Sequence, residues 1–109
     1  MRVSPADIAV LEGKAEEAAE FLKALANPHR LLILCRLVME REASVGHLVD
    51  AVGLGQSALS QHLAKMRDEG IVTTRRDAQT VYYRIADKNA ARVLSLLKDI
   101  YCPRVQWRS

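Results

Sequence analysis

Two cysteines are the side chains of this 109-residue chain whose chemistry is easiest to name. Cys35 stands in the apolar run LLILCRL, and Cys102 stands in DIYCP near the other end of the chain. A thiolate can attack an electrophilic sulfur, and a second thiol can resolve the adduct. The plainer alternatives are a small core hydrophobe at Cys35 and an unreactive terminal thiol at Cys102. Because burial raises the pKa of a thiol, we expect Cys102 to react first and Cys35 to resolve.

Polar side chains of another kind gather in residues 56–67, whose sequence is QSALSQHLAKMR. Leu59, Leu63 and Met66 fall on one face of a helix there, and small polar and basic residues fall on the others. Glutamine can pair with adenine, serine can bond base edges or phosphates, and lysine reaches guanine or the DNA backbone. The candidate DNA-contacting residues are Gln56, Ser57, Ser60, Gln61, His62, Lys65 and Arg67. The alternative is an ordinary solvated helix face.

His62 could serve as a metal ligand, a core histidine or a DNA contact. No second His or Cys stands three or four positions away from it. A convergent metal site is therefore disfavoured, and a hydrogen bond to phosphate or to the helix scaffold is favoured.

A third polar group stands where two short segments rich in β-branched and aromatic residues meet. The two segments, residues 71–76 and 80–85, predict a β-hairpin. Its tip carries the second set of candidate DNA contacts, which are Arg75, Arg76, Gln79 and Thr80. Paired arginines suit the strong negative potential beside a minor groove, and a charged solvated turn is the alternative.

Helices must hold these groups in place. Apolar residues at three- and four-residue steps predict helices over 7–26, 28–40, 44–52, 56–69 and 87–102. In the first of them, Ile8, Leu11, Leu22 and Leu25 belong to a single stripe that we expect to be buried. We expect the 28–40 helix to be central and buried, because LLILCRLV is apolar on nearly every side.

Local signals mark where these elements end. Asn27-Pro28 ends the first helix, Ser44 and Asp87 are N-cap candidates, and Gly70 suits the position after a helix. The predicted fold is mainly α with a β-hairpin wing, in the order α-α-α-α-β-β-α. Two short helices joined by a Gly-containing turn and followed by a hairpin form a winged helix-turn-helix.

The length predicts one domain. We expect a flexible N-terminal arm over 1–6, a DNA-binding and dimerisation domain over 7–103, and a flexible tail over 104–109. The net charge is +3, and residues 27–109 carry thirteen basic and eight acidic side chains. A basic surface suits double-stranded DNA as a partner. Half of the residues are apolar, which leaves surface for a second copy in a homodimer.

Several classes of protein are disfavoured. We see no secretory signal pattern and no apolar stretch long enough to cross a membrane, so we expect a soluble, cytoplasmic protein. Two widely separated cysteines do not make a disulfide framework. We find no triad, phosphate-cradling glycine loop or paired carboxylates, so we expect no enzymatic activity.

Three segments together resemble the ArsR/SmtB-type winged-helix repressors. They are FLKALANPHRLLILCRLV, LSQHLAKMRDEGIVTTRRDAQTVYYRI and KDIYC, and the similarity covers roughly residues 15–103. The resemblance implies a homodimer joined through the first and last helices. It also implies repression that ends when a small inducer is sensed.

This chain differs from the metal-sensing members of the family at the positions of their metal ligands. The arsenic-type members have two cysteines where this chain has Ser44 and Gly46, and the zinc-type histidines are missing between Asp87 and Cys102. We therefore expect neither a metal nor a cofactor.

The two cysteines are similar to those of the sulfide- and persulfide-responsive branch of the family. That resemblance implies that Cys35 and Cys102 become linked by a disulfide or polysulfide bridge when reactive sulfur species arrive, and that DNA is then released. A direct disulfide needs Cα atoms within about 7 Å, whereas a longer sulfur chain spans a wider gap.

Two alternatives stay open. One is a metal or general oxidant sensor that uses the thiols with His29, His47 or His62. The other is a winged helix that binds protein rather than DNA.

Overall fold

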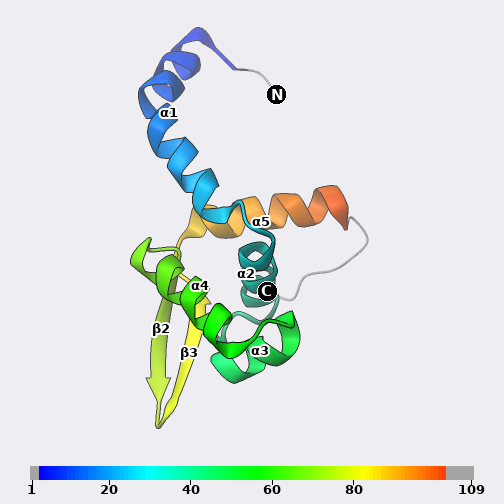
Figure 1. The fold of residues 1–109 in the computed structure, drawn as a ribbon. Coiled ribbons are helices and arrows are strands. Elements are labelled where there is room, and N and C mark those ends of the chain that lie inside the picture. Colours follow the sequence, from blue (N-terminus) through cyan, green and yellow to red (C-terminus); the bar gives the residue numbers. More distant parts are fainter. Residues whose placement is uncertain (1–2, 103–109) are drawn as a thin grey trace.

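The computed structural model describes residues 3–102 (Figure 1). In this part of the chain, the elements are α1 (Pro5–Leu25), α2 (Pro28–Glu40), β1 (Ala43–Ser44), α3 (Val45–Val52), α4 (Gln56–Asp68), β2 (Val72–Asp77), β3 (Thr80–Ile85) and α5 (Lys88–Tyr101). The predicted mainly helical fold with a hairpin wing is confirmed. The tail expected over 104–109 lies outside the described residues.

Side-chain caps explain most of the helix starts. The Asn27 carboxamide oxygen accepts from the backbone N–H of His29 at 2.9 Å and starts α2. Ser44 accepts from His47 N–H at the start of α3, and Asp87 caps α5, so both predicted caps are confirmed. These bonds satisfy amide groups that a helix leaves unpaired at its first turn.

The first helix begins earlier than predicted. Ser4 and Asp7 form a reciprocal capping box, with the Ser4 hydroxyl accepting from Asp7 N–H at 3.1 Å. α1 therefore begins at Pro5, and the start expected at Asp7 is wrong by two residues. The cause is that proline suits a first helical turn when a cap precedes it.

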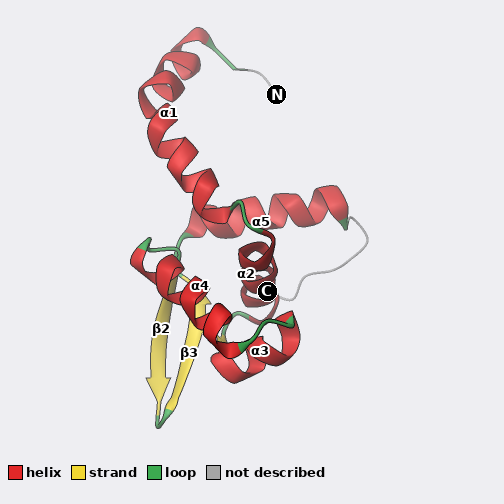
Figure 2. Ribbon diagram, viewed as in Figure 1, coloured by secondary structure: helices red, strands yellow, loops and turns green. Residues whose placement is uncertain are grey.

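Three antiparallel strands form the sheet in the order β1-β3-β2, and Figure 2 shows the long hairpin of β2 and β3. The predicted hairpin of β2 and β3 is confirmed, with Asp77 opposite Thr80. β1 was not predicted, because two residues are too few to show an alternating pattern. Its Ala43 pairs with Tyr83, which ties the start of α3 to the wing.

The core gathers around α2. Ile33, Leu34 and Leu37 of α2 are buried together with Leu48, Leu94 and the inner face of α4. The expectation that α2 is buried on nearly every side is wrong at Leu32, which is 52% exposed. No described element covers that face of the helix completely.

α1 projects away from this core (Figure 1). Leu25 is its buried residue, whereas Ile8, Leu11 and Leu22 of the predicted stripe are exposed. The expectation of a buried stripe is therefore wrong for a single chain, because the helix extends beyond the layers that could cover it. Leu96, Ile100 and Tyr101 of α5 are exposed as well.

None of the helices in the described residues has the length and apolar character needed to cross a membrane.

Candidate functional site

Helix α4 presents the predicted DNA-contacting side chains together. Leu59, Leu63 and Met66 are fully buried and fix the helix against the core, as predicted. The opposite faces carry the polar set: Gln56, Ser57, Ser60, Gln61, Lys65 and Arg67 are exposed, and His62 is half-buried. The inner face therefore sets the orientation of the helix and leaves its outer side chains free to contact a ligand.

Two glycines shape the turns at the ends of α4. Gly53 ends α3 with φ 78° and allows the tight turn into α4. Gly70 has φ 77°, and its N–H donates to the Arg67 carbonyl at 3.0 Å. Gly70 is thus the predicted residue that ends α4, and the chain turns there into β2.

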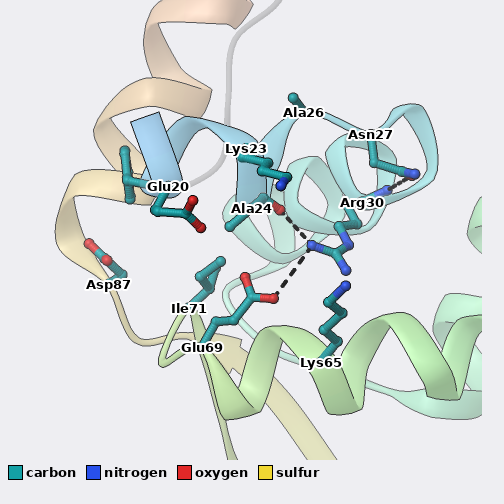
Figure 3. Close-up of a pocket in the computed structure, with 11 residues that line it drawn as sticks. Glu20, Lys23, Ala24, Ala26, Asn27, Arg30, Lys65, Glu69, Ile71 and Asp87 are labelled. Atoms are coloured by element: carbon teal, nitrogen blue, oxygen red, sulfur yellow. Dashed lines mark hydrogen bonds and ion pairs between the residues drawn. The ribbon is translucent and has the colours of Figure 1, made fainter. Parts of the chain in front are cut away.

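Arg30, which sequence reasoning did not single out, connects three helices (Figure 3). It is 8% exposed, and its Nη1 donates to the Ala24 carbonyl at the end of α1 at 2.9 Å. The same nitrogen lies 3.8 Å from the Glu69 carboxylate, at the end of α4. A cavity of about 690 Å³ opens beside it and is also lined by Lys65. A charged residue directly before the apolar run LLILC was the available signal for this contact.

Two histidines lie next to each other between α2 and α4. The His29 and His62 ring centroids are 5.9 Å apart. Burial lowers the pKa of His62, and the nearby positive groups Arg30, His29 and Lys65 lower it further. Lys65 and Arg67 are exposed on the same helix, and their positive charge favours an anionic partner.

The wing carries the second predicted set, and all four side chains are exposed. Arg75 and Arg76 lie within β2, opposite Tyr82 and Val81, rather than at the tip. Consecutive residues of a strand point to opposite faces, so the structure does not bring the two arginines together. Gln79 lies in the two-residue turn, and Thr80 opens β3.

Arg75 has a partner that the sequence did not suggest. Its Nε donates to one Glu42 carboxylate oxygen at 2.8 Å, and its Nη2 donates to the other. The guanidinium also lies 4.5 Å from the centre of the Tyr82 ring. The hydrogen bond from Arg75 is the main cause that lowers the pKa of Glu42, and it likewise raises the pKa of Arg75.

The two cysteines are free thiols in different environments. Cys35 is half-buried on α2, and Cys102 is exposed directly after α5. Burial raises the pKa of Cys35, and negative charge on Cys102 raises it further. Helices α2 and α5 contact each other in the core, so the two thiols belong to neighbouring elements. A hollow of about 280 Å³ lined by Leu32, Cys35 and Arg36, among others, gives solvent a path to Cys35.

Across the described residues 3–102, no three His, Cys, Asp or Glu side chains converge as a metal site would require. His47, one of the histidines considered for such a site, instead bonds Glu40 at 2.7 Å.

Known proteins resemble this chain along most of its length. A family model described as "Bacterial regulatory protein, arsR family" matches residues 27–74. The HTH-type transcriptional regulator YgaV of Escherichia coli is 46% identical over 89% of this chain and 98% of its own.

Two solved structures resemble this chain in both fold and sequence. Reduced HlyU from Vibrio cholerae has a TM-score of 0.77 and 44% identity, covering 84% of this chain and 96% of its own. The transcriptional repressor BigR from Xylella fastidiosa has a TM-score of 0.80 and 40% identity, covering 95% of this chain and 100% of its own.

Proposed function

The chain belongs to the ArsR family of bacterial regulatory proteins and is a DNA-binding transcriptional repressor, and we propose how it binds and releases DNA. It acts as a homodimer on double-stranded operator DNA. It releases the operator when Cys35 and Cys102 react with persulfide or another reactive sulfur species. The observation that carries the switch is the placement of a half-buried thiol on α2 and an exposed thiol directly after α5, two helices that contact each other in the core.

The polar side of α4 enters the major groove. Gln56, Ser57, Ser60 and Gln61 are exposed near the start of the helix, where a recognition helix contacts base edges. Lys65 and Arg67 follow them and supply positive charge for phosphates, and His62 is placed to form a hydrogen bond with the phosphate backbone. In the wing, Arg76, Gln79 and Thr80 approach the flanking minor groove and backbone.

The second copy covers the apolar side chains that one chain leaves exposed. Leu11 and Leu22 on α1 and Leu96 and Ile100 on α5 are all more than half exposed. Apolar surface of this extent marks an interaction site in a small protein. Two α4 helices of a two-fold dimer then face the two halves of a palindromic operator.

The thiol switch is a pair of sulfur-transfer steps. The Cys102 thiolate attacks the terminal sulfur of a small persulfide, R–S–SH, and expels the R–S⁻ thiolate, which leaves Cys102–S–SH. The Cys35 thiolate then attacks the inner sulfur and expels HS⁻, which joins the cysteines in a disulfide. A bridge one sulfur longer forms when each cysteine first accepts a persulfide sulfur and HS⁻ leaves on joining.

The bridge changes DNA binding through the helices that it connects. Cys35 lies on α2, which packs against α3 and the sheet, and Cys102 follows α5. Linking the two helices alters how the core supports α3 and α4. Two relatives support this proposal, because HlyU of Vibrio cholerae has a defined reduced state and BigR of Xylella fastidiosa is a transcriptional repressor.

Operator titration with and without a persulfide donor tests the proposal. The reduced protein binds with an affinity that falls steeply with salt, and the donor releases the DNA. Cys35→Ser and Cys102→Ser proteins bind equally well and stay bound after treatment. Release by both variants excludes the cysteine switch.

A parallel titration with Zn²⁺ or Cu²⁺ addresses the metal-sensor alternative. Tight stoichiometric metal binding that weakens operator affinity would replace sulfur sensing with metal sensing.

A further inference from the structure

Glu42 occupies the connection between the core helices and the wing. It follows Arg41, which ends α2 with φ 68°, and it directly precedes β1. Because the strand order is β1-β3-β2, its ion pair with Arg75 reaches across β3 to the far strand of the sheet. The contact therefore joins the α2–α3 connection to the wing.

This ion pair lies on the outer face of the sheet. Ala43 and Val72 are buried and define the inner face, together with their partners Tyr83 and Ile85. Arg75 belongs to the alternate set, whose members face the other way. Tyr82 pairs with Arg75 across the hairpin, and the guanidinium lies over the face of the Tyr82 ring.

The geometry leaves Arg75 poorly suited to bind phosphate. Both Nε and Nη2 already donate to Glu42, which makes a two-point arginine–carboxylate contact. A phosphate that approached the guanidinium would also meet the negative Glu42 side chain. Arg76 points to the opposite face, and no acidic side chain of residues 3–102 forms an ion pair with it.

We propose that Glu42 and Arg75 form a latch that holds the wing against the α2–α3 connection, and that Arg75 is a positioning residue rather than a phosphate contact. The latch itself does not depend on the proposed DNA binding, whereas its expected effect on operator affinity does. Arg76 supplies the phosphate contact of the wing. Sequence reasoning grouped the two arginines, and their roles differ because their strand faces differ.

DNA titrations over a range of salt concentrations separate the two roles. Glu42→Gln and Arg75→Gln each weaken operator binding about three-fold, and the double variant weakens it no further, because either change opens the same latch. Neither variant changes the slope of log K against log salt.

The matched control is Arg76→Gln. It makes that slope shallower by about two per dimer, since each lost phosphate contact contributes about 0.9. A shallower slope for Arg75→Gln together with tighter binding by Glu42→Gln overturns the latch, because it shows Arg75 on phosphate with Glu42 as its competitor.

Hydrogen exchange of the free protein tests the latch without DNA. Both single variants speed exchange of the amides that pair β1 with β3, and the charge-exchanged protein Glu42→Arg/Arg75→Glu restores protection. Unchanged exchange in both single variants contradicts the latch even if DNA binding holds. Absence of salt-dependent DNA binding by the unaltered protein would contradict the proposed function while leaving this readout intact.

Discussion

Burial raises the pKa of the Cys35 thiol on α2, and a negative charge on Cys102, directly after α5, raises it further. The two residues are 67 positions apart in the sequence and belong to neighbouring elements, because α2 and α5 pack together in the core. Cys35 is half-buried and Cys102 is exposed, so a reagent from solvent reaches Cys102 more readily. This asymmetry supports the order of reaction expected from the sequence.

The coupling predicts a change in Cys35 when Cys102 is removed. Burial and negative charge both disfavour the Cys35 thiolate, so Cys102→Ser lowers the pKa of Cys35 but leaves it above its ordinary value. Site-resolved alkylation with iodoacetamide against pH measures this shift. A pH profile for Cys35 identical in the two proteins shows that the thiols do not interact.

Dimerisation through α1 predicts that a charge in its apolar stripe separates the chains. Leu11→Glu and Leu22→Glu leave the fold of one chain intact, because both side chains are exposed there. Each raises the dimer dissociation constant about a hundred-fold or more, through lost apolar burial in both copies. Sedimentation velocity measures the change. Glu16→Gln, at another exposed position of α1, is the control and stays dimeric; a Leu22→Glu dimer of unchanged stability contradicts the interface.

His62 predicts a pH dependence of DNA binding. Its pKa in the free protein lies below the ordinary 6.5, because of burial and the positive charges of Arg30, His29 and Lys65. A nearby DNA phosphate favours the protonated ring, so binding takes up a proton and affinity rises as the pH falls toward the pKa of the free protein. Operator titrations from pH 8 to pH 6 check this.

His62→Gln removes that component, and His47→Gln keeps it. The same pH dependence of DNA binding in all three proteins rules out His62 as the responsible group.

Without DNA, the lowered pKa of His62 makes the stability of the fold fall as the pH falls. The stability that neutral His62 contributes is present above about pH 6.5 and is lost as the pH falls, because the unfolded chain binds the proton more readily.

Arg30 predicts a large loss of stability for one buried substitution. Arg30→Met leaves the Ala24 carbonyl and the Glu69 carboxylate without their partner, and costs about 1–3 kcal/mol. Arg36→Met is the matched control, since the Arg36–Glu40 pair is exposed and its loss costs about 0.5 kcal/mol or less. Urea unfolding measures both. Equal losses would show that the Arg30 contacts do not stabilise the junction of α1, α2 and α4.

Local signals in the sequence predict much of this fold. Ser44, Asp87 and Gly70 mark helix ends because a cap involves residues only a few positions apart. Leu59 and Leu63 reveal the inner face of α4 by spacing alone.

Contacts between residues far apart in the sequence are not predicted by such local signals. Arg75 and Glu42 are separated by 33 positions, and their contact depends on the strand order rather than on any local pattern. The α1 stripe shows a further limit, because periodicity predicts an apolar face but not which chain covers it. Arg30 carried no assigned role in the sequence, since its partners belong to the ends of two other helices.

Peptide mass spectrometry of the persulfide-treated protein tests the sulfur switch most directly, when operator release is recorded on the same samples. The account predicts that the peptides containing Cys35 and Cys102 become joined within one chain, directly or through added sulfur atoms. The joined fraction rises in step with the fraction of DNA released, and a reductant reverses both. DNA release while the two peptides remain separate contradicts the account.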